Sequence, residues 1–468
     1  MNDSDRPIAS GHSLEGLIRI HPSIQFSAPD PRTGETLHAT DWTIPGLWSL
    51  AKLESADKKT SYWVDFPYSL GLLAPTYLHI ETGEAISGPT VEWYGDSLQR
   101  AWAGRVNQPV TLRVKKFREA RKPVLLNCLY PWHGDSVSLL LRSKALHQHQ
   151  LDVIVIIGPS VERLLPDYIA EAWIVEGRND FAIWNEGLDR SIKQEVARLD
   201  ECYIPRSFKP AHIDASDLEA ASETVPFDRE NWSDTLLKGP VVTFISRDDR
   251  CWCEPEKERN FANKILRGPL RRFRETLARR RNLRQTREQQ NRIEDLAHRL
   301  QKISPKLEFA VCGLKNSSGL PANLKDLRFD KMDGKVNRLW DEQCARSHVV
   351  LAIHGSHTMP HNGFGGSFIE LVPPNKWPNL LNTPFVTTRD LRETLFCYRF
   401  LPTSVTPHEL TLIILSLIYN YTSVRFAYHQ DFPEPISDAH YAQIVQVQQK
   451  RFAAIRECTD DLKEILSP

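Results

Sequence analysis

Residues 240–250 read PVVTFISRDDR and residues 348–357 read HVVLAIHGSH, and these two stretches decide the fold. Each begins with a nearly continuous apolar run that is rich in β-branched residues. A short run of this kind is typical of a strand buried on both faces of a parallel sheet. The polar residues that follow then lie at the carboxyl end of the strand, where open α/β sheets bind their ligands.

Other apolar runs of the same kind are spread along the chain, and stretches of helical periodicity separate most of them. These runs are PVLLNCL (123–129), LDVIVII (151–157), AWIV (172–175), CYI (202–204), LEFAV (307–311), FIELV (368–372) and PFV (384–386). Strands that alternate with helices predict parallel sheets with crossover helices, so the predicted fold class is α/β. The polar, acidic segment 211–235 is predicted to be a linker between two α/β halves.

These patterns divide the chain into four predicted regions. They are an N-terminal accessory region (1–120), a first Rossmann-like lobe (121–235), a second Rossmann-like lobe (236–404) and C-terminal helices (405–468). The accessory region is rich in Trp, Pro and Gly. Its tryptophans either fill the core of a small, partly β module or form a surface that stacks on sugars.

Composition excludes several classes of protein. Of 468 residues, 41% are hydrophobic and 25% are charged, which is unlike collagen, a coiled coil or a disordered chain. Lys plus Arg and Asp plus Glu both number 59, which argues against a protein that acts through bulk attraction to polyanions. The start of the chain lacks a basic and apolar signal pattern, and the apolar run Leu410–Val424 is too short to span a bilayer. We therefore expect a cytoplasmic location, and the scattered cysteines predict reduced thiols and no metal site.

The segment 267–302 is strongly basic, with twelve Lys or Arg residues against four Asp or Glu residues, a net charge of +8. Its apolar residues recur at near-helical spacing, so it predicts a long basic helix or a helical pair. Such a helix is either a solvated face or a surface for peripheral contact with an anionic inner membrane. Nucleic-acid binding is the least favoured interpretation, because aromatic residues do not alternate with the basic ones.

Three polar clusters follow predicted strands, and the first is the WHGDS sequence at 132–136. Gly134 allows a sharp turn, which places Asp135 at the start of a helix. There Asp135 is either an N-cap or a general base that faces the ligand cleft, with His133 as its helper or substitute.

The second cluster, SRDDRCW at 246–252, contains Arg247 and Arg250. Two guanidinium groups at a strand end suit a pyrophosphate, because each donates paired hydrogen bonds to phosphate oxygens. Asp248 and Asp249 either pair with these arginines, which we favour, or hold a metal-bound diphosphate.

The third cluster carries the most chemistry. It consists of His354, Gly355, Ser356 and His357, followed by the NGFGG run at 362–366 and by Glu370. A Gly-Ser turn that enters a helix offers free backbone N–H groups and the positive end of a helix dipole to an anion. Asn362 and Glu370 are candidate partners of sugar or ribose hydroxyls, and the alternative for Glu370 is an ordinary surface charge.

These three clusters resemble those of GT-B glycosyltransferases, and most closely the bacterial heptosyltransferase family. Residues 134–146 resemble that family's first loop, residues 246–252 its donor-phosphate segment, and residues 354–363 its Gly-Leu-Ser-His loop. The HGS sequence followed by FIELVP also resembles a GT-B group that includes plant xylosyltransferases and the EGF-domain N-acetylglucosaminyltransferase. Residues 1–120 and 267–302 have no counterpart in the heptosyltransferases.

The resemblance implies two Rossmann-like lobes with a cleft between them and a role for each cluster. Asp135 corresponds to the catalytic base, Arg250 to the basic residue on the donor diphosphate, where the family usually has Lys, and Gly355, Ser356 and His357 to the phosphate-binding turn. We therefore expect an inverting, metal-independent glycosyltransferase without a cofactor other than its co-substrate. It would move a sugar from a nucleotide diphosphate-sugar to a hydroxyl of a glycan, lipid-linked or protein acceptor.

Two other functions are compatible with the same sequence. One is another nucleotide-sugar enzyme, such as an epimerase or a hydrolase. The other is a non-catalytic scaffold that binds membrane or RNA through the basic segment 267–302.

Overall fold

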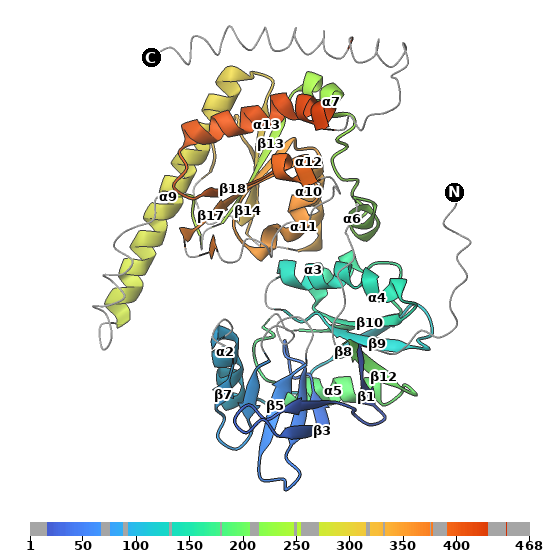
Figure 1. Ribbon diagram of the computed structural model, residues 1–468. Coiled ribbons are helices and arrows are strands. Elements are labelled where there is room, and N and C mark those ends of the chain that lie inside the picture. The colour runs from blue at the N-terminus through green and yellow to red at the C-terminus, as the bar shows by residue number, and fades with distance from the viewer. Residues whose placement is uncertain are drawn as a thin grey trace, which may run out of the picture. The chain divides into compact units, whose positions relative to one another are not determined.

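The computed structural model divides into two compact units, Met1–His212 (unit 1) and Ile213–Pro468 (unit 2), and each is described by itself. Both contain strands and helices, so the predicted α/β class is confirmed (Figure 1). The residues described are 16–66, 75–87, 92–130, 133–177, 180–205, 215–247, 250–253, 271–314, 319–330, 333–374, 376–377, 391–428 and 446.

Unit 2 is built on a sheet of six described strands, in which every neighbouring pair is parallel. The strands are β13 (Val241–Ser246), β14 (Glu308–Leu314), β15 (Lys325–Phe329), β16 (Val349–Ile353), β17 (Ser367–Val372) and β18 (Tyr398–Pro402). Their spatial order is β15-β14-β13-β16-β17-β18, which is 3-2-1-4-5-6 in chain order. This is the order of the doubly wound Rossmann fold, whose direction of winding reverses between the first and fourth strands.

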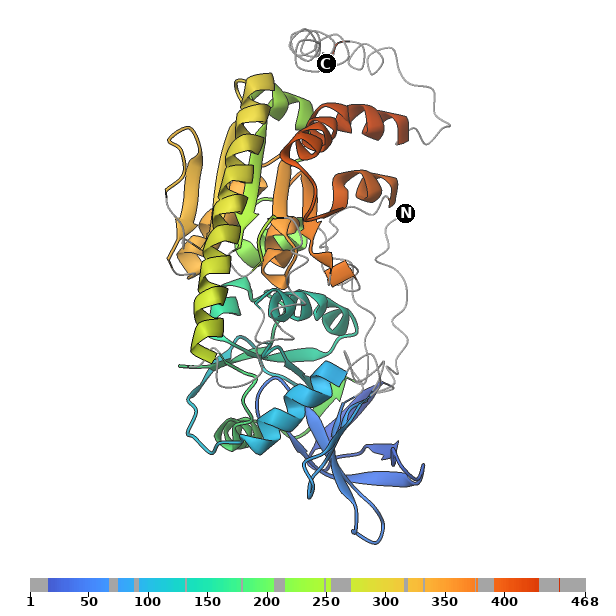
Figure 2. The same cartoon turned by 90° about the vertical axis from the view of Figure 1, so that its left-hand side faces the viewer.

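Successive side chains of a strand point to opposite faces of the sheet, so each strand has side chains to bury on both faces. Helices cover both faces of this sheet. The helices of unit 2 are α6 (Ala215–Ser222), α7 (Trp232–Lys238), α9 (Arg271–Ile303), α10 (Gly334–Ala345), α11 (Met359–Asn362), α12 (Leu391–Cys397) and α13 (Pro407–Tyr428), with the 3-10 turn η3 (Ser356–Thr358). Val242 and Phe244 of β13 share a buried cluster with α9 and α13. Thr243, between them, accepts a hydrogen bond from Gln343 of α10 at 3.1 Å. Figure 2 shows α9 (yellow) running alongside the strands of this unit.

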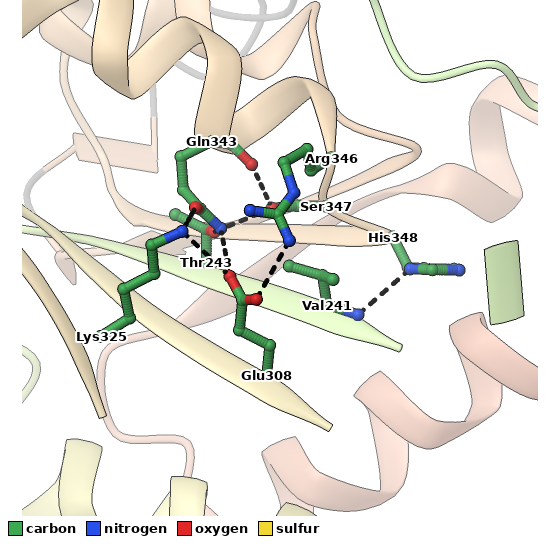
Figure 3. A network of polar contacts seen from close by, with 8 residues as sticks. All are labelled: Val241, Thr243, Glu308, Lys325, Gln343, Arg346, Ser347 and His348. Carbon is green, nitrogen blue, oxygen red and sulfur yellow. Dashed lines mark hydrogen bonds and ion pairs between the residues drawn. The ribbon is translucent and has the colours of Figure 1, made fainter. Parts of the chain in front are cut away.

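A polar network closes the amino ends of the unit 2 strands (Figure 3). Glu308 accepts from Lys325 at 3.3 Å and from Arg346 at 3.0 Å, and Lys325 also donates to Gln343 at 2.8 Å. His348 accepts from the backbone N–H of Val241 at 3.2 Å. Burial lowers the pKa of His348 to about 4, so this imidazole is neutral near pH 7.

The predicted linker 211–235 is wrong, because helix α6 lies within it and helix α7 begins within it. Leu218 of α6 and Trp232 of α7 are almost completely buried, and the Trp232 indole donates to the Ile418 carbonyl of α13 at 2.9 Å. The division between the units therefore comes before α6 and not after residue 235. Apolar residues spaced through a polar segment were enough to anchor it to the core.

Residues 271–302 of the basic segment lie in the single helix α9, which is one of the two predicted forms, and residues 267–270 lie outside the described residues. Ile293, Leu296 and Leu300 of its C-terminal half are buried in the unit 2 core, so they are not available to a membrane. The side chains of residues 271–283 are not among those described. The predicted strand 384–386 also lies outside the described residues, and so does the predicted helix 439–464 except for residue 446. No helix in the described ranges is long and apolar enough to cross a membrane.

Unit 1 contains a second sheet of six described strands. They are β1 (Leu17–His21), β8 (Leu112–Lys116), β9 (Pro123–Asn127), β10 (Asp152–Ile157), β11 (Glu171–Val175) and β12 (Cys202–Pro205), in the order β1-β12-β9-β10-β11-β8. The four central strands are parallel, whereas β1 and β8 pair antiparallel at the two edges. Both edge strands of the predicted first lobe thus come from residues before 121. These residues are part of that lobe's sheet and do not form an accessory region separate from it.

The remaining N-terminal strands form an antiparallel sheet of their own. It comprises β2 (Ser27–Pro29), β3 (Thr36–Thr43), β4 (Leu50–Glu54), β5 (Ser61–Asp65), β6 (Tyr77–His79) and β7 (Ala85–Ile86). The described helices of unit 1 are α2 (Glu92–Ala103), α3 (His133–Arg142), α4 (Lys144–Gln148) and α5 (Glu186–Val196), with the 3-10 turn η2 (Pro159–Leu164). Trp48 and Trp63 pack against α2 in a buried cluster, so they fill a core and offer no face to a sugar. Asn127, at the end of β9, donates to the Gly46 carbonyl at 2.9 Å and ties the two sheets together.

Asp65 is a buried carboxyl group in this N-terminal core, and the Tyr94 hydroxyl donates to it at 3.3 Å. Burial raises its pKa to about 8, well above the value of about 3.9 of an unfolded chain. Because the folded state favours the protonated form, this stabilisation is complete below about pH 4 and is lost as the pH rises through 8.

We predict that Asp65→Asn removes the loss of folding stability that wild-type Asp65 causes as the pH rises. The wild-type free energy of unfolding should fall relative to the variant by up to about 1.4 kcal/mol per pH unit between pH 4 and 8, so the variant is the more stable protein at pH 9. Urea denaturation from pH 5 to 9 measures this. Asp57→Asn is the control, because its exposed carboxylate has a pKa lowered to about 2 by a hydrogen bond from Ser55. If the free energy of unfolding changes with pH in the same way in the wild type and in Asp65→Asn, the raised pKa of Asp65 is contradicted.

Candidate functional site

Two loops of unit 2 meet at the point where the strand order reverses. Strands β13 and β16 are neighbours, with Ile245 opposite Ala352 near their carboxyl ends. From the loop after β13, Arg250 donates to the His354 carbonyl at 2.9 Å. Arg247 approaches His357 Nδ1 to 2.6 Å through its Nη1. The structure thus brings together the arginines and the histidine turn that the sequence had placed more than one hundred residues apart.

Gly355 leaves room for the guanidinium of Arg247, which packs directly on it. A Cβ atom at position 355 would lie 2.0 Å from Arg247 Nη1 and 3.0 Å from His357 Nδ1. Real Cβ atoms essentially never approach another heavy atom so closely, so any larger residue displaces the arginine. The close approach of this side chain is thus a physical reason for glycine at position 355.

Gln289 of α9 fixes the loop that carries Arg247. Its amide Nε2 donates to the Arg247 carbonyl at 2.9 Å, and its Oε1 accepts from the Trp252 N–H at 2.8 Å. Gln289 is almost completely buried. Sequence reasoning missed it, although one signal existed: Gln289 shares a helical face with the apolar residues Ile293 and Leu296.

His357 is held as a neutral imidazole. Burial, together with the positive charge of Arg247, keeps its pKa well below the usual value. An arginine N–H can only donate, so Nδ1 of His357 accepts and the ring proton lies on Nε2. This side chain is therefore a hydrogen-bond donor near pH 7 that carries no charge of its own.

Glu370 lies in β17 with a fully buried side chain, so the alternative of a surface charge is wrong. Its Oε1 is 2.8 Å from Nδ1 of His354, which is also buried. This carboxylate therefore faces an imidazole from the candidate turn. A contact between Glu370 and a ribose or sugar hydroxyl stays a prediction.

The NGFGG run packs the chain against the core. Phe364 is buried, a Cβ at Gly365 would lie 2.6 Å from Val350, and one at Gly366 would lie 2.6 Å from the Trp232 ring. These glycines are needed for close packing between the loop and the sheet. Asn362 is also buried, and its predicted contact with a sugar is untested.

The turn after β16 enters only a short helical segment. It consists of the three-residue η3 and the four-residue α11, and the Thr358 hydroxyl closes it by donating to the Gly355 carbonyl at 2.8 Å. The helix dipole that we expected is correspondingly small, since it requires aligned peptide units over several turns. The positive charge of the site therefore comes mainly from Arg247 and Arg250. The side chain of Ser356 lies outside the description.

The first cluster lies in unit 1, where α3 begins at His133. Asp135 is partly buried in the first turn, so its predicted place at a helix start is confirmed. It lies inside the helix and not before it, so it is not the N-cap. A carboxylate in this turn interacts favourably with the helix dipole. The side chain of His133 lies outside the description.

Among the described residues, no group of three or more His, Cys, Asp or Glu is placed to hold a metal ion. Asp248 and Asp249, the predicted alternative, lie outside them. The thiol of Cys251 donates to the Arg247 carbonyl at 3.8 Å, and that of Cys253 to the Cys251 carbonyl at 3.6 Å. These two cysteines therefore belong to the packing of the arginine loop.

Comparison with known proteins adds no relative. No family model matches the chain, and no curated protein matches it either.

We predict that Gly355→Ala weakens anion binding at this site by about tenfold or more, because the added methyl group displaces the Arg247 guanidinium. Isothermal titration with inorganic pyrophosphate measures the dissociation constant. Gly319→Ala is the matched control, since nothing lies within 4 Å of the added Cβ there. An unchanged pyrophosphate affinity in Gly355→Ala would contradict the role of this contact.

Proposed function

We propose that unit 2 binds the diphosphate of a nucleotide-sugar and that the protein transfers the sugar to an acceptor hydroxyl. One observation carries this proposal: Arg247 and Arg250 meet the His354–His357 turn at the reversal point of a 3-2-1-4-5-6 sheet. Ligands of doubly wound sheets bind at this point, at the carboxyl ends of the strands. Two guanidinium groups there match the geometry and the charge of a pyrophosphate.

The chemistry of the transfer explains why arginines suit this site. When the bond between the sugar and the diphosphate breaks, negative charge grows on the leaving phosphate oxygens. Fixed positive groups that already point at these oxygens stabilise the transition state without reorganising, which is often the largest catalytic contribution. Arg247 has such a fixed position, because Gln289 holds its backbone and His357 contacts its guanidinium. The proposed mechanism is inverting and assigns charge neutralisation to arginines and not to a metal.

The proposed enzyme is GT-B-like, with unit 2 as the donor lobe and unit 1 as the acceptor lobe. A parallel-rich sheet in each unit supports this proposal. In unit 1, Asp135 is the proposed general base that takes the proton of the acceptor hydroxyl. A carboxylate in the first turn of a helix has the charge and the partial exposure that such a base needs.

A panel of ADP, GDP, UDP, TDP and CMP, each with and without Mg²⁺, tests the donor site by thermal shift. We expect one diphosphate to raise the melting temperature without Mg²⁺, since a ligand at about 100 times its Kd stabilises the folded state by about 2.7 kcal/mol. Arg250→Ala should weaken its binding by about tenfold to a hundredfold, as for a lost hydrogen bond to a charged group.

Arg338→Ala is the control for that panel, because it removes an exposed arginine that pairs with Glu223 away from the site. The proposal fails if no nucleotide stabilises the wild type, and the scaffold alternative then gains weight. A shift that requires Mg²⁺ would instead favour a metal-bound diphosphate.

For the general base, we expect Asp135→Asn to lower sugar transfer by about 10²- to 10⁴-fold and to leave the affinity for the nucleoside diphosphate unchanged. Transfer to an array of immobilised glycans, with the nucleotide-sugar that the panel indicates, measures the rate. Asp167→Asn, at an exposed carboxylate of the same unit, is the control. Full activity of Asp135→Asn would rule out this assignment.

A further inference from the structure

A buried pair of side chains lies beside the proposed diphosphate site. His361 of α11 and Asp341 of α10 are both fully buried, and His361 Nδ1 is 2.7 Å from Asp341 Oδ1. Neither residue was among the candidates from the sequence. A carboxylate cannot donate, so Nδ1 of His361 carries a proton that points to Asp341, and in a neutral imidazole with that tautomer Nε2 is an acceptor.

Two ring nitrogens in this region have no hydrogen-bond partner although both are buried. One is Nε2 of His361, and the other is Nε2 of His357. The first is an acceptor because Asp341 fixes the proton on Nδ1, whereas the second is a donor because Arg247 occupies Nδ1 of His357. The two unsatisfied groups are therefore complementary.

The local backbone also favours an interaction between these two rings. His357 and His361 are four residues apart on consecutive helical turns, η3 and α11. That spacing puts side chains on the same face of a helix. A buried polar group without a partner is costly, and a link between the two nitrogens removes that cost for both.

We propose that Asp341 and His361 are positioning residues of the diphosphate site. One buried water accepts the Nε2–H of His357 and donates to Nε2 of His361. This link keeps Nδ1 of His357 turned towards Arg247. Arg247 is then held over Gly355, where it meets a phosphate. This inference rests on the proposed function and deepens it, because it names the support that orients one of the two arginines.

Two substitutions at position 361 separate this role from a purely structural one. An Asn side chain places its amide near the position of Nδ1 and keeps the bond to Asp341, whereas a Gln side chain places its amide near Nε2 and keeps a partner for His357. We expect His361→Asn to raise the Kd for pyrophosphate by about tenfold in the full chain while its melting temperature stays close to that of the wild type. We expect His361→Gln to melt at a lower temperature, because its contact with Asp341 is lost, but to bind pyrophosphate nearly as well as the wild type.

A spectroscopic readout makes the test independent of ligand binding. Long-range ¹H–¹⁵N spectra of the histidine rings should show His357 as the Nε2–H tautomer in the wild type and in His361→Gln, and as a mixture of tautomers in His361→Asn. His298→Asn, which changes an exposed histidine of α9, is the control.

Two results would overturn the positioning role. One is pyrophosphate affinity that follows thermal stability in both variants, and the other is a His357 signal that neither variant changes. A wild type that binds neither pyrophosphate nor any nucleoside diphosphate would overturn the proposed function instead. The tautomer of His357 in that same protein would still decide whether His361 positions it.

Discussion

The parallel pairing of β13 with β16 is the constraint on which the rest of unit 2 depends. It places the ends of two strands from distant parts of the chain side by side, with Ile245 opposite Ala352. A shift of one residue would reverse the faces of every side chain in the strand. Val242 and Phe244 would then leave the α9 and α13 face, and Arg247 would no longer reach the turn at Gly355. The apolar core therefore fixes the register, and the register fixes the site.

The two ends of this sheet have different polar character. At the amino ends, the network around Glu308 and Gln343 satisfies its buried groups through many short contacts (Figure 3). At the carboxyl ends, one ring nitrogen of His357 and one of His361 lack hydrogen-bond partners. Proteins commonly accept such local costs at functional sites when the remaining structure is stable enough to maintain them. This contrast favours the carboxyl ends as the functional end of unit 2.

Sequence reasoning succeeded where one pattern had one structural solution. The apolar runs at β13 and β16 were predicted, and the polar residues after them do meet at one edge of the sheet. It failed where a segment had a mixed pattern. The acidic stretch around α6 and α7 was predicted to be a linker, because its few apolar residues, such as Trp232, reveal their importance only when they are buried against α13. The residues before 121 were set apart because strand pairing with β12 or β11 leaves no local signal.

The sequence by itself determined the α/β class, the strand ends and the kinds of charge that follow them, because side-chain periodicity and apolar content are local properties. The tertiary structure alone decided that Arg247 packs on Gly355, that Gln289 holds its loop, and that Asp341 supports His361. Each of these contacts joins residues that are between twenty and about one hundred and ten positions apart. Contacts of that kind depend on the register of the sheet and on the packing of helices, and no local pattern encodes either.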